Sequence, residues 1–269
     1  MRALLWLITT GWAAVGSVTL AAQAGCPPDS VAVGPICVDK YEASIWQVSP
    51  SSSLVKKIQR GKVTLADLTA GGAIQLSTIT GFSPPRLPLF PANFPPDGRW
   101  TPAPGSDPPS PGIYAVSVAG VLPSNATWYR AVQACALSGK RLLTSEEWQR
   151  AATGTPESGI ADDGIATCAT MSAGPVRSGS RANCVSAWGA FDMVGNVPEW
   201  VADRVPFGSV CGPPGWPGCG TSPVLPGTPV PVSVGGGWWG GQFASVLSFY
   251  STTDPADTGD QPFGFRCGR

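Results

Sequence analysis

The chain has 269 residues, and its 17 lysines and arginines balance its 17 aspartates and glutamates. This balance gives no bulk attraction to nucleic acid, so we expect no nucleic-acid partner. Histidine is absent, which excludes Ser-His-Asp and Cys-His catalysis, HExxH zinc sites and iron centres of the two-His-one-carboxylate kind. Glycine and proline are numerous, but 11 tryptophans and a hydrophobic fraction of 43% predict a loop-rich globular domain.

The N-terminal segment has the pattern of an export signal. Arg2 precedes an uncharged apolar run over 3–22, and "AAQAGC" fits the small-x-small rule for signal peptidase. We predict a cleaved signal peptide over 1–24 and a single domain over 25–269, with no membrane span after cleavage. Two alternatives are a retained membrane anchor and a lipoprotein with its lipid on Cys26, although Gln23 stands where a Leu or Val is expected.

All eight cysteines follow the predicted signal. An even count behind an export signal favours disulfides formed in an oxidising compartment, so we expect a secreted, periplasmic or cell-envelope protein. No CxxC pair occurs, which argues against a thiolate zinc knuckle and against a thioredoxin-type redox site.

Three segments have the pattern of short strands. In chain order they are "ICVDKYEASIW", "GIYAVSVAGV" and "PVPVSVGGGWW". The first two are separated by a proline-rich insertion at about 50–112, which contains "FSPPRLPLFPANFPP" and implies an extended, polyproline-like backbone. We expect a long surface excursion there, with a partner-binding polyproline strand as the alternative.

Two helices are predicted between the second and third of these strands. In "NATWYRAVQACALSGK", Thr127 is the expected N-cap and Gly139 ends the helix in the left-handed conformation. In "TSEEW", Thr144 and Glu147 form a capping box that begins the next helix. The predicted buried faces are Trp128, Ala131, Val132, Cys135 and Ala136 in the first helix, and Trp148, Ala151 and Ala152 in the second.

Four blocks carry a resemblance to a known family. "NATWYRAVQACALSGKRLLTSEEWQRAATG", "GAFDMVGNVPEW", "GGGWW" and the terminal "GFRCGR" resemble, in order and distance over about 113–269, the signature blocks of the formylglycine-generating enzyme or sulfatase-modifying factor family. The first predicted strand resembles the opening strand of that family. The resemblance implies an α+β fold: a loop-rich relative of the C-type lectin fold with two helices and short mixed sheets, here stabilised by disulfides.

The block "FDMVGNVPEW" suggests a cation site. Its two carboxylates flank a Gly-Asn turn whose carbonyls can point inward, so that hard oxygens could converge on one ion. A hydrogen-bonded turn is the alternative. The matching block of the family binds calcium, and the resemblance carries this role to the side chains of Asp192 and Glu199 and to the carbonyls of Gly195 and Val197.

The resemblance also implies one disulfide, Cys135–Cys267, because the family pairs the cysteine of the first helix with that of the final "GFRC". The other cysteines are paired here only by their proximity in the sequence. This gives Cys26–Cys37, Cys168–Cys184 and Cys211–Cys219.

The chain departs from the family at the catalytic site. Catalytic members oxidise a substrate cysteine with copper held by two cysteines shortly after a "GGS" turn, since a soft Cu(I) ion needs soft thiolates. Here the turn reads "GGGWWGGQFASVLSFY", and Gly241 and Val246 occupy the matching places. With no cysteine between Cys219 and Cys267 and no imidazole, we expect neither copper nor the oxidase activity.

The sequence therefore favours a calcium-stabilised binding module that lacks the copper site. The expected recognition segment lies between "GGGWW" and "GFR", by analogy with related lectin-like domains. Its ligand could be a glycan, a peptide or a surface protein. The alternatives are an oxidoreductase of the formylglycine-generating type acting on a protein cysteine, and a structural component of the cell envelope. The candidate ligand-binding residues are Trp238, Trp239, Gln242, Phe243 and Tyr250.

Two further patterns match functional motifs, but a structural role explains each of them better. "GGGWWG" also fits GxGxxG, but no helix signal or correctly placed acid follows it, so its glycines are expected to serve tight turns. If its tryptophans lie on a strand, one faces the core and the other a ligand. Four carboxylates could form an acid/base pair for a glycosidase, although a solvated surface or helix-start role is expected. They are Asp39, Glu42, Glu146 and Glu147.

Overall fold

The computed structural model describes residues 25–82, 112–206, 229–251 and 262–269. The predicted signal peptide and the pair Cys211–Cys219 lie outside these residues. The described elements form an α+β fold with much irregular chain between them. The helices are α1 (Ser53–Gln59), α2 (Leu65–Ala70), α3 (Trp128–Leu137), α4 (Ser145–Ala152) and the 3-10 helix η1 (Gly241–Phe243).

The strands form three small sheets with the orders β1-β2-β11-β6, β10-β7-β8-β9 and β4-β3-β5. Neighbours are antiparallel except β10 and β7, which pair in parallel. The strands of the first sheet are β1 (Ser30–Val33), β2 (Ile36–Asp39), β11 (Cys267–Gly268) and β6 (Arg141–Leu142). Those of the second are β10 (Gly264–Phe265), β7 (Glu199–Pro206), β8 (Pro229–Val234) and β9 (Phe249–Ser251), and those of the third are β4 (Ile74–Leu76), β3 (Ala43–Val48) and β5 (Gly112–Ser117).

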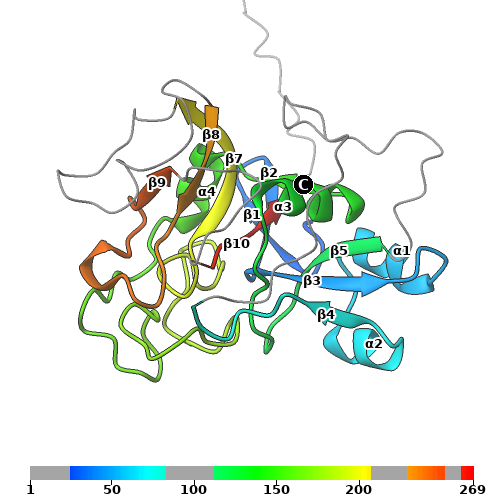
Figure 1. The fold of residues 1–269 in the computed structure, drawn as a ribbon, viewed down its shortest axis with the longest axis horizontal. Helices are drawn as coiled ribbons and strands as arrows, with labels where there is room; N and C mark the ends of the chain where they lie inside the picture. The colour runs from blue at the N-terminus through cyan, green and yellow to red at the C-terminus, as the bar shows by residue number, and fades with distance from the viewer. Residues whose placement is uncertain (1–24, 83–111, 207–228, 252–261) are drawn as a thin grey trace, which may run out of the picture.

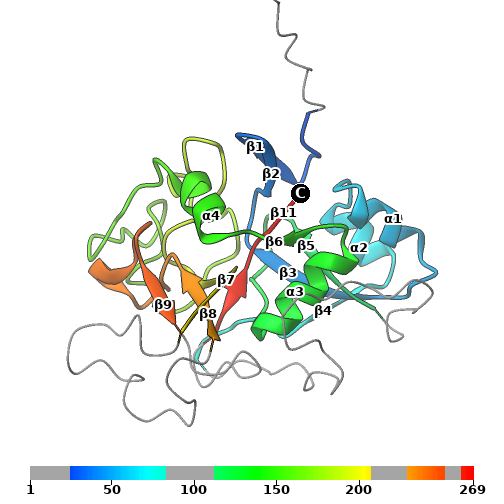
Figure 2. The same cartoon turned by 90° about the horizontal axis from the view of Figure 1, so that it is seen from above.

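The sheets divide the fold into two ends joined by the C-terminal strands (Figure 1). Figure 2 shows β3, β4 and β5 with α1 and α2 at one end, β7, β8 and β9 with α4 at the other, and β11 between them. Three of the hydrophobic clusters follow this division, and the central one packs α3 against β3, β5 and β7. The C-terminal strand β11 lies between β2 and β6, because it pairs with both.

The two helices predicted from the sequence are present, with both predicted ends of α3 and the predicted start of α4. The Thr127 hydroxyl accepts the Arg130 N–H at the start of α3, and Gly139 has a φ of 68° after its end. The buried face of α3 is wider than predicted. Val132 and Ala136 are only half-buried, whereas Gln133 is buried and accepts a hydrogen bond from Arg130. The predicted face of α4, which is Trp148, Ala151 and Ala152, is buried.

The capping box of α4 forms as predicted, and its removal gives a measurable loss. The Thr144 hydroxyl accepts the Glu147 N–H, and the Glu147 carboxylate accepts the Thr144 N–H. We expect Thr144→Ala to lower the free energy of unfolding by about 1 kcal/mol, because the N–H of Glu147 loses its partner. Urea unfolding followed by circular dichroism measures the change. Gln149→Ala, on the exposed face of the same helix, should change stability by less than about 0.5 kcal/mol, and an equal loss in both variants would contradict the role of the cap.

Three sequence predictions need correction. The proline-rich insertion expected at about 50–112 begins with ordered structure, since α1, α2 and β4 lie within it and α2 has its own capping box at Thr64 and Asp67. The opening strand is interrupted, with β2 ending at Asp39 and β3 beginning at Ala43. Asp39 and Glu42 were expected on a solvated surface, but both side chains are buried. Residues 83–111 lie outside the described part of the chain.

The predicted disulfides in the described residues are confirmed: Cys26–Cys37, Cys135–Cys267 and Cys168–Cys184. The second joins α3 to β11 across 132 residues of sequence. The first fastens the chain before β1 to β2. The third links two segments without regular secondary structure that precede the "FDMVGNVPEW" block.

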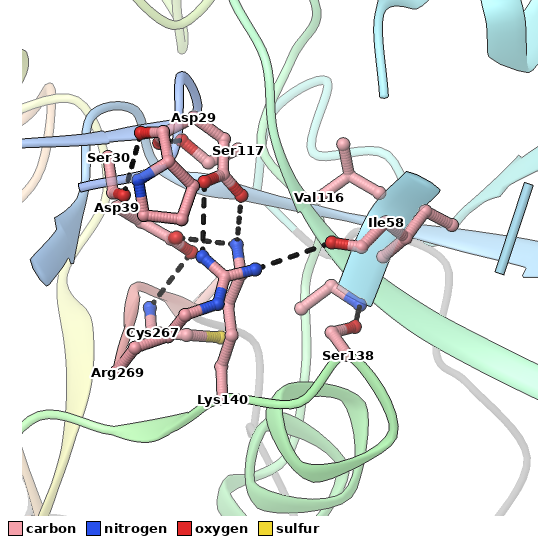
Figure 3. A network of polar contacts seen from close by, with 12 residues as sticks. Asp29, Ser30, Asp39, Ile58, Val116, Ser117, Ser138, Lys140, Cys267 and Arg269 are labelled. Carbon is pink, nitrogen blue, oxygen red and sulfur yellow. Dashed lines mark hydrogen bonds and ion pairs between the residues drawn. The ribbon is translucent and has the colours of Figure 1, made fainter. Parts of the chain in front are cut away.

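A buried ion network holds the same central region together (Figure 3). The Lys140 ammonium lies between Asp29 and Asp39, at 2.7 Å and 2.5 Å from their carboxylate oxygens, and its side chain is completely buried. Arg269 donates to the other oxygen of Asp29. The network explains why the Asp39 side chain is buried and not exposed to solvent as predicted. It fastens the segment after α3 to the β1–β2 hairpin and to the C-terminal residue.

Candidate functional site

The "FDMVGNVPEW" block is a buried turn whose backbone suits its residues. Asp192, Gly195 and Asn196 all have positive φ values, of 58°, 78° and 52°. At Gly195 a Cβ would lie 2.3 Å from the Ala169 carbonyl oxygen, so glycine is required by space as well as by φ. Asparagine and aspartate are the residues that most readily accept such φ values without being glycine. The turn predicted from the sequence is therefore present.

One end of the block is bound by a buried arginine. The Arg266 guanidinium donates to both carboxylate oxygens of Glu199, at 2.8 to 3.2 Å, and the Trp148 indole donates to one of them at 2.7 Å. Arg266 also donates to the carbonyls of Asp39 and Phe191. The Arg266–Glu199 ion pair and its neighbours join β2, α4, β7 and the C-terminal segment. Both carboxylate oxygens of Glu199 are bonded to Arg266.

The middle of the block meets a second buried carboxylate. The Asn196 amide donates to Glu42 Oε2 at 2.5 Å, and the Ser178 hydroxyl donates to the same oxygen at 3.1 Å. Asp192 accepts the Gly179 N–H at 2.6 Å. Burial raises the pKa of Asp192 to about 7, and burial together with repulsion from Asp192 and Glu199 raises the pKa of Glu42 well above its usual value.

The donor set of the block suits a hard divalent cation. It offers carboxylate and carbonyl oxygens, which are the ligands of Ca²⁺. Its buried carboxylates, Glu42, Asp192 and Glu199, outnumber the single guanidinium of Arg266 that bonds within it. Glu42 Oε1 is buried and has no hydrogen-bond partner. Among the described residues no three Asp, Glu, His or Cys side chains are grouped to hold a metal ion, so a cation here needs backbone carbonyls as well.

The structure separates the residues predicted to bind a ligand. Trp238 is 2% exposed and packs in a small cluster with Ile79 and Val197, whereas Trp239 is partly exposed. Phe82, 57% exposed, covers both indoles, with ring centroids 5.2 and 5.0 Å away. One tryptophan is therefore in the core and the other is partly accessible, as predicted. Both lie in the turn after β8, however, and not on a strand.

Gln242 and Phe243 lie in η1 with their side chains exposed, whereas Tyr250 on β9 is half-buried. The Phe243 carbonyl accepts hydrogen bonds from the hydroxyls of Ser248 and Tyr250, which folds the chain after η1 back over it. Gln242 and Phe243 thus lie on an exposed turn, and Tyr250 helps to fix that turn through its hydrogen bond.

The sequence analysis missed the apolar neighbours of η1. A Cβ at Gly241 would lie 3.2 Å from the Met171 sulfur and 3.6 Å from Ile160 Cγ2, so these two side chains lie beside η1. Leu247 follows in the turn closed by Ser248. We call these side chains with Phe243 the η1 patch: Ile160, Met171, Phe243 and Leu247, which are 54% to 76% exposed. Isolated apolar residues in a Gly- and Asp-rich stretch are the signal that could have revealed Ile160.

One acidic group lies beside the η1 patch. The Glu157 carboxylate accepts the N–H of Val246, the residue before Leu247, at 2.8 Å. The patch is therefore an apolar surface with a carboxylate at its Leu247 end.

Comparison with known proteins agrees with the resemblance found in the sequence. A family model described as "Sulfatase-modifying factor enzyme 1-like domain" matches residues 8–269. Among solved structures, a Major Tropism Determinant P3c variant is 17% identical, with a TM-score of 0.44, and the match covers 90% of this chain and 52% of that one. The protein in "Crystal Structure of CarF" is 15% identical, with a TM-score of 0.41 and coverage of 87% and 86%. The chain thus spans about half the length of the Major Tropism Determinant variant. No curated protein matches.

Proposed function

Because the chain belongs to the family of sulfatase-modifying factor enzyme 1-like domains, we propose that it is a member that binds a ligand and has no copper site. The observation that carries this proposal is the backbone at Gly241, one of the two positions that match the copper cysteines. Its φ is 53°, and a Cβ there would crowd the Met171 sulfur at 3.2 Å. A cysteine would be strained at this place, and the second position is Val246.

We further propose that the η1 patch, with Gln242 and Trp239, is the recognition surface. Exposed apolar side chains grouped on one face are typical of sites that bind another molecule. Phe243 supports this role because its side chain is 54% exposed although it lies in a turn fixed by hydrogen bonds to its own carbonyl. A pre-ordered apolar anchor loses little conformational entropy on binding.

Calcium, in this proposal, is a structural cation at the "FDMVGNVPEW" block. Asp192 and the carbonyls of Gly195 and Val197 would hold it, whereas Glu199, which the resemblance also assigns to calcium, has both carboxylate oxygens bonded to Arg266. When bound, calcium supplies positive charge to a buried cluster with more carboxylates than guanidinium groups. Its role is to stabilise the turn between the third disulfide and β7.

Export is the remaining part of the proposal. The three disulfides of the described residues support it, because structural disulfides persist in oxidising compartments. None of the described helices is both long and apolar enough to cross a bilayer. The mature chain would begin at Gly25 and act outside the cytoplasm.

A binding screen tests the recognition surface. The purified chain is screened against a glycan array and a displayed peptide library, and each ligand obtained is measured against the double variant Phe243→Ser, Leu247→Ser. We expect the double variant to lose at least tenfold in affinity, because truncating central apolar anchors costs roughly 1.4 kcal/mol or more. Ile74→Ser, which alters a 60% exposed residue on β4, is the matched control and should keep its affinity. Ligands that bind both variants equally well would contradict the assignment of the surface.

A further inference from the structure

Glu42 is a buried residue with only one of its two carboxylate oxygens hydrogen-bonded within the described residues. Its side chain is 0% exposed and lies in the break between β2 and β3. Oε2 accepts two hydrogen bonds, from Asn196 and Ser178, whereas Oε1 is buried and has no hydrogen-bond partner among the residues that the structure describes. Such an atom is uncommon, because leaving a buried carboxylate oxygen unpaired carries a large desolvation penalty.

The hydrogen bond to Asn196 brings this carboxylate to the "FDMVGNVPEW" block. Asn196 lies between the two residues whose carbonyls are assigned to calcium, and its amide is 2.5 Å from Glu42 Oε2. Glu42 and Asn196 are 154 residues apart in the sequence. The unpaired oxygen therefore belongs to the same buried polar cluster as Asp192, although it comes from the opening segment of the fold.

The cluster contains more buried carboxyl groups than guanidinium groups bonded to them. Arg266 is hydrogen-bonded to Glu199 and to backbone carbonyls, which leaves Glu42 and Asp192 without a guanidinium of their own. The nearby Arg181 lies 3.7 Å from Asp162 and 3.8 Å from Asp163.

We propose that Glu42 Oε1 takes the place of Glu199, whose two carboxylate oxygens both accept from Arg266, as the second carboxylate ligand beside Asp192 of the calcium ion assigned to the "FDMVGNVPEW" block. This inference rests on the proposed calcium site and extends it to a residue outside the family's signature block. An ion held in this way links the β2–β3 break to the turn before β7. A hard divalent cation satisfies the unpaired oxygen and offsets the excess of buried carboxylates at the same time.

Glu42→Gln tests the proposal because it preserves the size of the side chain and one carbonyl oxygen. That oxygen can still accept from Asn196 and Ser178, so a role limited to these hydrogen bonds leaves calcium affinity unchanged. Isothermal titration of the metal-free chain with calcium alone should show at least a tenfold weaker dissociation constant than the wild type. The rise in melting temperature on adding calcium should also be smaller for the variant than for the wild type.

The controls separate this inference from the calcium site itself. Asp192→Asn should abolish binding, and Glu146→Gln, at an 82% exposed carboxylate, should bind like the wild type. Glu42→Asp keeps the carboxylate on a side chain that is one methylene shorter, and it replaces the Gln variant if that variant fails to fold. We expect it to bind calcium more weakly than the wild type. Wild-type affinity in the Glu42 variants would overturn the role of Glu42 and leave the calcium site standing. A wild-type chain that binds no calcium would overturn both.

Discussion

Replacing Cys135 and Cys267 together with alanine should lower the free energy of unfolding by about 5 kcal/mol. The bond closes a loop of 132 residues, and the chain-entropy model gives a loss of this size when so long a constraint is removed from the unfolded state. Both sulfurs are buried in the central cluster between α3 and the C-terminal strands, so lost packing acts in the same direction. Urea unfolding followed by tryptophan fluorescence and by circular dichroism measures the change and checks that the two transitions coincide.

The double variant Cys26→Ala, Cys37→Ala is the matched control. Its disulfide closes a separation of only 11 residues, so the same model gives roughly 3 kcal/mol. A larger loss from the short loop than from the long one would show that the long bond does not hold the two ends of the fold together.

Arg266→Met should lower the free energy of unfolding by roughly 3–5 kcal/mol, the range for breaking a buried ion pair from one side. The variant leaves the Glu199 carboxylate buried with only the Trp148 indole as a partner, and it removes the donors to the carbonyls of Asp39 and Phe191. Methionine fills much of the volume that arginine occupied, so the lost stability comes mainly from the missing polar contacts and less from a cavity.

Two variants check this result. Arg141→Met removes a half-exposed guanidinium that is paired with Glu147 on the surface, and we expect a loss below about 1 kcal/mol. Adding Glu199→Gln to Arg266→Met should restore part of the stability, because the two residues are coupled and the unpaired charge is removed. Additive losses from Arg266 and Glu199 would contradict the pair as the anchor of the block.

Local signals in the sequence predicted local structure well. Thr127, Gly139 and Thr144 each act through groups within a few residues, so both ends of α3 and the start of α4 could be predicted from spacing alone. The Cys135–Cys267 bond followed from the family resemblance and not from distance in the sequence. The helices α1 and α2 were missed because the proline-rich stretch behind them dominated the composition of the whole insertion.

The errors concern residues whose partners are remote in the sequence. Asp39 and Glu42 stand in a strand-like segment where charged residues normally face water. Their partners, Lys140 and Asn196, lie 101 and 154 residues further along the chain. In the same way the neighbours of η1, Ile160 and Met171, come from a loop that precedes it by many residues. Pattern and periodicity contain no information about such pairings.

The metal content of the mature chain, Gly25 to Arg269, tests the central claim most directly. The protein is expressed with export, purified without chelator, dialysed and measured by inductively coupled plasma mass spectrometry. The proposal of a calcium-stabilised binding module without a copper site predicts about one calcium per chain and no copper. Stoichiometric copper would contradict it, because the chain would then hold the oxidase metal at a site where Gly241 and Val246 replace the expected cysteines.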